Sequence, residues 1–439
     1  MAKQTYSSDE AAKVNPSVSA MRTLFQENCT GKRRGIYSVC SANQLVLEAA
    51  FAQAVKDESL LLIEATCNQV NQDGGYTGLT PALFREYVCA LAEGADFPEE
   101  RLILGGDHLG PNPWRSEPAT QAMKKAAVMV EAFVCAGFTK IHLDTSMRCA
   151  GDPDVLGDAE IAERAAQLCE IAETAAAETM QWPVYIIGTE VPTPGGAQGE
   201  LEIAVTSTIN VRRTLDLHRD AFKRRGLESA WERVVGVVVQ PGVEFGDESV
   251  ADYVAENAAE LSQWVVGQTG IIFEAHSTDN QMDSSLEQLV RDHFAILKVG
   301  PELTFVMREA VFGLARIEEE WIPDSNRSNI RSVLDRVMTE YPENWKAYYR
   351  GNPHHLKIAR AYSLSDRIRY YWPNADVSEA LSVLTKNLLD NPAPLPLIAQ
   401  YLPYEAEAIR RNQIINDPRA IIRHRIQLTL SRYSKACGA

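Results

Sequence analysis

Several features that would direct a chain to a membrane or to nucleic acid are missing from these 439 residues. No stretch reaches the ~18 consecutive apolar residues of a membrane-spanning helix, and the polar start MAKQTYSSDEAAKVNPS lacks the apolar core of a signal peptide. The 43 Lys and Arg are outnumbered by 59 Asp and Glu, and the net charge of −16 leaves no basic footprint for nucleic acid or an anionic membrane. We therefore expect neither partner, while a small anionic substrate stays compatible because binding depends on the local site.

Cysteine pairs and nucleotide-binding motifs are absent as well. The eight cysteines form no CxxC pair, and several lie within apolar runs. This pattern is typical of reduced, mostly buried thiols, so we expect a cytoplasmic protein. The sequence contains neither a GxGxxG nor a Walker motif. Hydrophobic residues make up 45% and charged residues 23%, as in packed globular proteins, which excludes disorder as the main state.

Eight short apolar runs alternate with longer helical patterns between residues 35 and 320. Near-continuous apolar runs are typical of strands that are buried on both faces. The predicted strands are Gly35–Cys40, Leu60–Glu64, Leu102–Gly106, Lys140–Leu143, Val184–Gly188, Val234–Gln240, Gly270–Glu274 and Ala295–Val299. Helices are predicted at Ala42–Lys56, Thr80–Glu93, Ala119–Cys135 and Ala159–Thr179. Eight strand–helix units fit a closed parallel barrel better than an open sheet, so we predict an α/β fold, a (β/α)8 TIM barrel with its N-terminal lead-in at 1–320.

Residues 321–439 carry no strand pattern and are rich in Tyr, Trp and Leu. Helical stretches are predicted at Asn344–Tyr349, Val377–Asp390, Leu397–Tyr401 and Ala420–Tyr433, separated by breaks that contain Pro353, Pro373, Pro392, Pro394, Pro403 and Pro418. We expect this C-terminal extension to be a helical appendage that packs on the barrel.

Polar side chains gather where the predicted strands end, which is the catalytic end of a (β/α)8 barrel. They are Asp107 and His108, His142 and Asp144, Glu190, Gln240, Glu274, His276 and Asp279, and Lys298. Imidazole and carboxylate groups that converge from different strands are a candidate divalent metal site, and they suit Zn²⁺, Co²⁺, Ni²⁺ or Mn²⁺. Such an ion can polarise a carbonyl group, and a nearby carboxylate such as Asp107 can move a proton.

Two further features complete this hypothesis. His142 precedes Asp144 by two residues, so we expect His142 to lie behind the pocket and Asp144 nearer to it. Ser277–Asn280 and the Gly195–Gly196 turn are candidates for binding sugar hydroxyls or a phosphate. The structural alternative stays open for each residue, because an Asp after a strand often caps the next helix and a His can satisfy loop carbonyls.

Resemblance to a known family rests on five stretches: GGDHLGPNPW, KIHLDTSM, IGTEVPTPGGA, FEAHSTDNQ and LKVGPELTFVMREA. They resemble the tagatose-bisphosphate aldolase Z-subunit family over nearly the whole chain. That family is related in fold to the zinc-dependent class II ketose-bisphosphate aldolases, which are (β/α)8 barrels.

The resemblance implies roles for individual residues. Asp107 and His108 are similar to the Asp-His pair of class II aldolases, in which Asp transfers a proton and His binds the metal. His276 resembles the metal-binding His after strand seven, and Glu190 resembles an acidic loop residue that can serve the metal. Gln240 departs from the family pattern where class II enzymes have a further metal His. His276-Ser277-Thr278-Asp279 replaces their Gly-Gly-Ser phosphate cradle, which places bisphosphate binding in question.

The leading functional hypothesis is a metal-dependent aldolase or C4-epimerase that acts at C3–C4 of a ketohexose or its (bis)phosphate, tagatose or fructose. Zn²⁺ is the first choice of metal, with Ni²⁺, Co²⁺ or Mn²⁺ as alternatives. The predicted metal ligands are His108, Glu190, Gln240 and His276; the predicted catalytic residues are Asp107, Glu190 and Asp144; the predicted substrate-binding residues are Ser277, Asp279, Asn280 and Lys298.

Two alternatives remain at this point. The chain could be a non-catalytic subunit that stabilises the catalytic Y subunit of a class II tagatose-bisphosphate aldolase. A tagatose-6-phosphate kinase ranks last, because no nucleotide phosphate loop is present. We also expect the chain to form a homo-oligomer.

Overall fold

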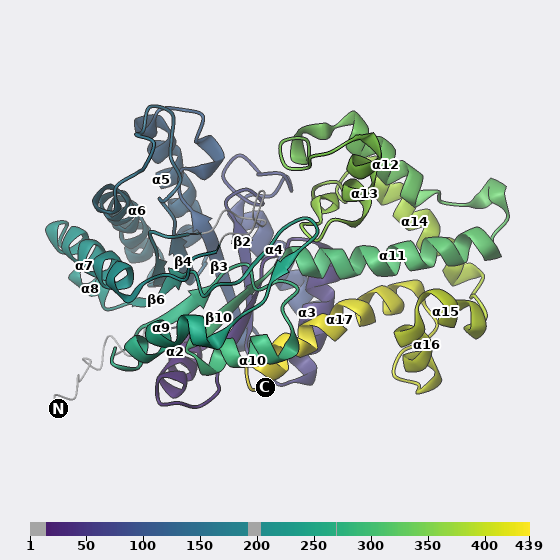
Figure 1. The fold of residues 1–439 in the computed structure, drawn as a ribbon, viewed down its shortest axis with the longest axis horizontal. Coiled ribbons are helices and arrows are strands. Elements are labelled where there is room, and N and C mark those ends of the chain that lie inside the picture. Colours follow the sequence, from purple (N-terminus) through teal and green to yellow (C-terminus); the bar gives the residue numbers. More distant parts are fainter. Residues whose placement is uncertain (1–14, 192–202, 269) are drawn as a thin grey trace.

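The computed structural model describes residues 15–191, 203–268 and 270–439, and its centre is a closed barrel of parallel strands ringed by helices (Figure 1). Around the barrel the strands follow the order β1-β10-β9-β6-β5-β4-β3-β2. They are β1 (Ile36–Val39), β2 (Leu61–Thr66), β3 (Leu102–Leu109), β4 (Lys140–Leu143), β5 (Val184–Ile187), β6 (Val234–Val239), β9 (Ile272–Ala275) and β10 (Phe294–Val299). Every predicted strand is present, and the predicted fold class is confirmed.

Helices follow the strands and cover the outside of the barrel (Figure 1). They are α3 (Gln44–Lys56), α4 (Pro81–Gly94), α5 (Ala119–Cys135), α6 (Asp158–Thr179), α7 (Thr208–Arg224), the short α8 (Glu228–Trp231), α9 (Ala255–Val266) and α10 (Asp283–Arg291). A two-stranded antiparallel ribbon of β7 (Glu244–Phe245) and β8 (Val250–Ala251) lies in the loop after β6. The four helices that the sequence analysis predicted end within one or two residues of their predicted bounds.

The barrel interior is apolar in the half near the amino ends of the strands. Side chains two residues apart on a strand share a face, so each strand sends alternate residues inward. Near the strand starts these residues are apolar, as are Ile36, Leu62 and Ile103. Helix α2 (Pro16–Cys29) packs Met21 and Phe25 against the same cluster and closes this end of the barrel. Polar groups inside the barrel are therefore confined to its carboxyl end.

Helix α11 (Pro301–Trp321) runs from the end of β10 away from the barrel and leads into the appendage expected at 321–439 (Figure 1). The helices after it are α12 (Ile330–Glu340), α13 (Pro353–Tyr362), α14 (Ala375–Asp390), α15 (Leu395–Tyr401), α16 (Pro403–Arg410) and α17 (Pro418–Ala436). The predicted helix at Asn344–Tyr349 is wrong: a 3-10 turn at Pro342–Asn344 leads into turns, because too few residues separate Pro342 from Gly351 to nucleate a helix. Three prolines that the analysis read as breaks each begin a helix, where the missing N–H is harmless: Pro353, Pro403 and Pro418.

The last helix, α17, returns to the barrel and packs against α3, α10 and α11. The Tyr433 hydroxyl donates a hydrogen bond to the Thr278 carbonyl at 2.7 Å, and the Ser434 hydroxyl donates one to Asp57 at 2.6 Å. The C-terminal segment of the chain thereby covers the flank between α3 and α10 that a barrel helix normally covers.

No helix in the described part of the chain is both long and apolar enough to cross a membrane. All eight cysteines are free thiols; four of them are buried, and Cys135 is exposed.

A pH dependence of stability follows from His218 on the inner face of α7. The ring is buried, and its Nδ1 lies 2.8 Å from the Thr214 carbonyl oxygen. Burial lowers the pKa of His218 from 6.5 to about 4. The unfolded chain therefore takes up this proton before the folded chain does. The contribution of His218 to stability is complete above pH 6.5 and is lost as the pH falls toward 4.

We expect His218→Gln to remove up to about 3 kcal/mol of this acid destabilisation, measured by urea unfolding across that pH range. His354→Gln, on the exposed side of α13, is the matched control and leaves the pH profile unchanged. A wild-type slope that persists in His218→Gln contradicts the assignment.

Candidate functional site

Three imidazole rings meet at the carboxyl end of the barrel. The ring centroids of His108 and His142 lie 5.1 Å apart, those of His108 and His276 4.9 Å, and those of His142 and His276 5.3 Å. With Asp107 they offer one ligand atom each, all within 4.8 Å of one another, and all four residues are buried. The site thus brings together groups from β3, β4 and the segment after β9.

Local backbone geometry explains why neighbouring residues share this site. Asp107 follows the period-two alternation of β3, so His108 would ordinarily point out of the barrel. His108 instead adopts a positive φ of 50°, and the pairing of β3 with β4 shifts register between Gly106 and Leu109. This irregularity turns both side chains inward, and such strain is typical of functional sites.

Each imidazole contacts a carboxylate through one nitrogen and keeps the other for a ligand. The pairs are His108 Nδ1 with Asp144, His142 Nδ1 with Asp107 Oδ1 and His276 Nε2 with Glu274, at 2.7, 2.9 and 2.9 Å. Carboxylates in this position orient metal-binding histidines. The Nε2 atom of His142 is buried and has no hydrogen-bond partner among the described residues. The donor set and this orphaned nitrogen fit a divalent metal ion.

Two lysines are buried among the acids beneath the imidazoles. The Lys140 ammonium contacts Glu64 at 2.5 Å and Glu274 at 2.7 Å. The Lys298 ammonium contacts Glu64 and lies 2.7 Å from Asp107. Gly105 on β3 leaves the space for the Glu64 carboxylate, because a Cβ at this position would overlap it. All these side chains are at most 6% exposed.

The charges of this network explain its protonation. Burial opposes the charge on Asp107, yet His108 and Lys298 hold its pKa well below its ordinary range. Burial likewise opposes the charge on Glu274, yet Lys140 and Lys298 hold its pKa well below its ordinary range. Four carboxylates (Glu64, Asp107, Asp144 and Glu274) face two ammonium groups, so with His108 neutral, as a metal ligand must be, the carboxylates are in excess. A divalent cation would neutralise that excess, which is a second reason why the residues fit a metal.

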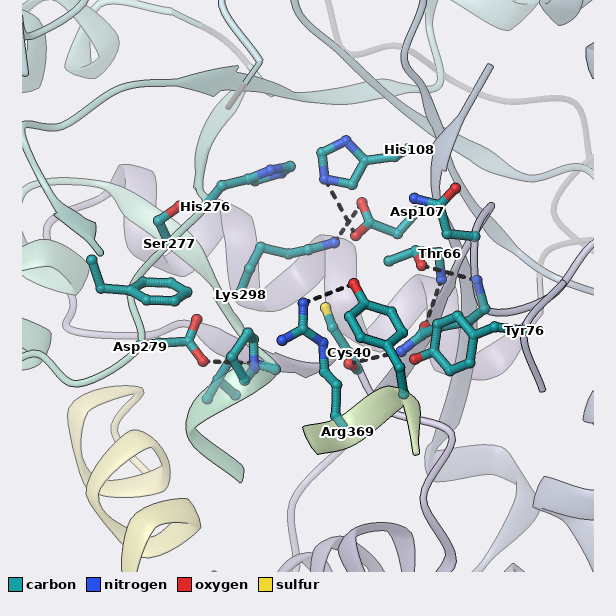
Figure 2. Close-up of a pocket in the computed structure, with 17 residues that line it drawn as sticks. Cys40, Thr66, Tyr76, Asp107, His108, His276, Ser277, Asp279, Lys298 and Arg369 are labelled. Atoms are coloured by element: carbon teal, nitrogen blue, oxygen red, sulfur yellow. Dashed lines mark hydrogen bonds and ion pairs between the residues drawn. The ribbon is translucent and has the colours of Figure 1, made fainter. Parts of the chain in front are cut away.

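A cavity lies above the imidazoles and Lys298, and its volume is about 680 Å³ including the open space at its mouth. In Figure 2, His108, His276 and Lys298 border it on one side, and Arg369 reaches toward it from the other. The side chain of Ser277 also lines this cavity. Of the predicted substrate-binding residues, Lys298 and Ser277 therefore face the space that a substrate would occupy.

The other two predicted substrate-binding residues make hydrogen bonds to the start of α11. The Asp279 carboxylate lines the cavity, but its Oδ1 accepts hydrogen bonds from the backbone N–H groups of Gly300 and Glu302, at 2.9 and 2.8 Å. Asp279 thereby caps α11, and burial raises its pKa to about 7. Asn280 donates its backbone N–H to Glu302 at 2.7 Å.

Two predicted metal ligands do not join the cluster. Gln240 is in phase with the inner face of β6, but its Oε1 accepts from the N–H groups of Gly242 and Val243, at 2.8 and 3.0 Å, and so closes a turn. The exposed carboxylate of Glu190 accepts from Thr206 and Asn210, at 2.7 and 2.5 Å. The Gly195–Gly196 turn lies outside the described residues.

The structure also corrects the expected order of His142 and Asp144. His142 is in the cluster, while Asp144 lies behind His108 and also accepts a hydrogen bond from the Ser146 hydroxyl. Sequence reasoning missed the network residues Glu64 and Lys140, although the period-two pattern that places His142 inside also places Lys140 inside. It also missed Arg369, for which no local signal exists.

These features define a (β/α)8-barrel protein with a metal-compatible site at the end of the barrel where barrel enzymes carry their chemistry. The family model of the D-tagatose-1,6-bisphosphate aldolase subunit GatZ/KbaZ-like proteins matches residues 21–438, and the chain belongs to this family. The resemblance found in the sequence is thus confirmed.

A solved structure of a related protein covers most of the chain. The chain is 46% identical to a probable tagatose 6 phosphate kinase from Sinorhizobium meliloti 1021, over 92% of this chain and 100% of that one, with a TM-score of 0.85. It is 11% identical to the YdjI aldolase from Escherichia coli K12 and 13% identical to the fructose-bisphosphate aldolase from Campylobacter jejuni, with TM-scores of 0.40 and 0.43. Both matches cover 85% of this chain, and 98% and 92% of the other chains.

The buried network makes a prediction for stability. Lys140 does not line the cavity and makes its ion pairs entirely inside the barrel. Lys140→Met leaves Glu64 and Glu274 without that ammonium, and we expect a loss of about 3–5 kcal/mol in the free energy of unfolding. Lys386→Met, which removes an exposed ion pair with Asp390, is the control and changes stability little. Urea denaturation followed by circular dichroism measures both. Equal effects of the two substitutions would contradict the role assigned to Lys140.

Proposed function

We propose that this protein is a divalent-metal-dependent enzyme that cleaves or remakes the C3–C4 bond of a ketohexose or its phosphate. The observation that carries the proposal is the convergence of three imidazoles on one buried point beside Asp107 and Lys298, at the floor of the mouth cavity. Membership of an aldolase subunit family supports the same bond as the site of reaction.

We propose His108, His142 and His276 as the residues that hold the ion, with Asp107 at its side. His142 thereby takes the place first given to Glu190 and Gln240, whose oxygens are engaged elsewhere. When bound, the ion supplies Lewis-acid polarisation of the ketose carbonyl and its neighbouring hydroxyl. Zn²⁺ suits three imidazoles best, and Ni²⁺, Co²⁺ and Mn²⁺ are alternatives.

Asp107 is the group that we assign to proton transfer. Its Oδ1 is bound by His142 and Lys298, whereas its Oδ2 makes no hydrogen bond among the described residues and remains available to a substrate hydroxyl. Because its pKa is held low, Asp107 enters the reaction as a carboxylate and takes the proton from the C4 hydroxyl as the C3–C4 bond breaks. The Lys298 ammonium, 2.7 Å from Asp107, stabilises negative charge at this point.

One arrangement supports two outcomes. Breaking C3–C4 gives a three-carbon enediolate and an aldehyde. In the aldolase outcome a proton, equal to the one that Asp107 took from the C4 hydroxyl, is delivered to C3 of the enediolate, and the two three-carbon products are then released. Rotation of the aldehyde and re-addition at its other face inverts C4, which interconverts fructose and tagatose. Asp107 returns the proton to the new C4 oxygen in that case.

A second candidate is a subunit that stabilises the catalytic subunit of a tagatose-bisphosphate aldolase. The description of the family as an aldolase subunit favours it. In that case the buried charge network has a structural role only. The name of the Sinorhizobium meliloti relative points to a kinase, but the sequence has no nucleotide phosphate loop to support such a role here.

Metal binding tests the ligand set directly. We expect about one divalent ion per chain by elemental analysis, lost in His142→Ala and in His276→Ala because each removes one of three imidazole donors. Gln240→Ala and Glu190→Ala are the matched controls and keep the ion. Loss of the ion in the controls and retention in His142→Ala would restore the ligands first inferred from the sequence.

Turnover tests the reaction. Purified protein loaded with Zn²⁺, Ni²⁺ or Mn²⁺ is assayed with fructose, tagatose and tagatose 1,6-bisphosphate. We expect EDTA and His276→Ala to abolish activity, and Asp107→Asn to lower kcat by about 10²–10⁴-fold, because the amide cannot accept the proton. Activity that survives EDTA and His276→Ala would refute the proposal. No turnover by the metal-loaded chain, with stimulation of a separate class II aldolase Y subunit, would establish the subunit role instead.

A further inference from the structure

The appendage contributes a cation to the mouth of the barrel. Arg369 lies in the short 3-10 helix η5 (Arg367–Tyr370) and lines the mouth cavity opposite the imidazoles (Figure 2). The segment before it is fixed to the barrel loop between β7 and β8, because the hydroxyls of Ser363 and Ser365 donate to Asp247 at 3.0 and 2.7 Å. The ring of Tyr370 packs edge-on against Tyr76, with centroids 4.8 Å apart. Arg369 is therefore held in place, although it lies far along the chain from the other residues of the site.

Arg369 is partly buried and has no carboxylate partner among the described residues; the neighbouring Arg367 is buried and makes no ion pair either, whereas several other arginines of this acidic protein do. Arg164, Arg308 and Arg425 pair with Asp152, Asp366 and Glu405, at 2.7, 3.1 and 2.7 Å. Arg369 instead donates to the carbonyls of Ser365 and Asp366 and to the Tyr370 hydroxyl, and it makes no ion pair within the described part of the chain. Its Nε–H has no hydrogen-bond partner among the same residues. A guanidinium in this state is ready for an anionic ligand.

A second cavity of about 860 Å³, also counted to its open mouth, adjoins the first. Both cavities are lined by Arg369, Tyr76, Gln69, Cys40 and Gly300, so the guanidinium stands at their common boundary. The second cavity adds the polar groups of Ser41 and Thr77 and the ring of Trp372. An extended ligand that reaches from the imidazoles into the second cavity passes the Arg369 guanidinium.

The usual anion site of a (β/α)8 barrel is filled in this protein. Barrel enzymes commonly bind phosphate at backbone N–H groups near the ends of the last two strands and a following helix N-terminus. Here Asp279 accepts from two of those N–H groups, on Gly300 and Glu302. A second anion at that position would meet the Asp279 carboxylate, so an anionic substrate needs its counter-charge elsewhere.

We propose that Arg369 binds the anionic end group, a phosphate ester or a carboxylate, of an open-chain ketose whose C3–C4 bond lies at Asp107. This proposal rests on the proposed function for the identity of the ligand, while the anion site itself can be tested without turnover. The appendage thereby selects the substrate, and neutral ketoses lack the group that it recognises.

The binding test uses inorganic phosphate and isothermal titration calorimetry; the intrinsic tryptophan fluorescence is a second readout, because Trp372 lines the second cavity. We expect Arg369→Gln to weaken phosphate binding at least about tenfold. Arg369→Lys should bind phosphate with intermediate affinity, because the ammonium keeps the positive charge but lacks the paired N–H donors of the guanidinium. Metal content is unchanged in both variants. Arg336→Gln, an exposed appendage arginine paired with Asp376, is the matched control and binds phosphate as the wild type does.

The kinetic test compares tagatose, tagatose 6-phosphate and the ketose with a C6 carboxylate. We expect one anionic sugar to have the highest kcat/KM and Arg369→Gln to raise its KM at least about tenfold, with a much smaller effect on the KM of tagatose. The anionic sugar preferred by the wild type distinguishes phosphate from carboxylate. Phosphate affinity and KM values that are all unchanged in Arg369→Gln would overturn the proposal. If no sugar reacts but Arg369→Gln still abolishes phosphate binding, the proposed function fails and the anion site stands.

Discussion

The site depends on two ammonium groups buried among carboxylates at the carboxyl end of the barrel. Without Lys140 and Lys298, the buried carboxyl groups of Glu274 and Asp107 would lose cations that hold their pKa values low, and Glu64 would lose both of its ion-pair partners. Ionised, these acids do two things at once: they hold the lysines, and two of them orient imidazoles. Removing one member therefore changes the charge on the others, so the positions of the histidines follow from ion pairs that lie below them.

The barrel could be predicted from the sequence because its strands are buried on both faces and read as separate apolar runs. The helices between the first strands were equally readable, since Pro81 and the Ala-rich pattern of α6 mark them. The appendage was harder. A proline breaks a helix when it lies in the interior but is well accepted in the first turn, where its missing N–H is harmless. Pro353 and Pro403 were therefore read as breaks, although each begins a helix.

The candidate site was predictable only to the level of which strand ends carry polar groups. Which of those groups meet depends on backbone detail that leaves no trace in composition or spacing. The positive φ of His108 turns it inward, and the turn after β6 engages the Gln240 amide that the alternation alone would leave free. Period-two alternation does place Lys140 and His142 on one face, and weighing it fully would have moved His142 into the cluster. Arg369 comes from a helical region that has no sequence relation to the barrel.

The position of α17 has a consequence for how the protein is made. All eight strands of the barrel are synthesised within the first 300 residues, yet the helix that packs against both α3 and α10 is α17, which begins at Pro418. When every barrel strand of a nascent chain has left the ribosome, the apolar surface of α3 and α10 against which α17 packs is still exposed. Completion of the barrel must therefore wait until α17 has been synthesised, and until then this apolar surface is one that a chaperone would have to shield.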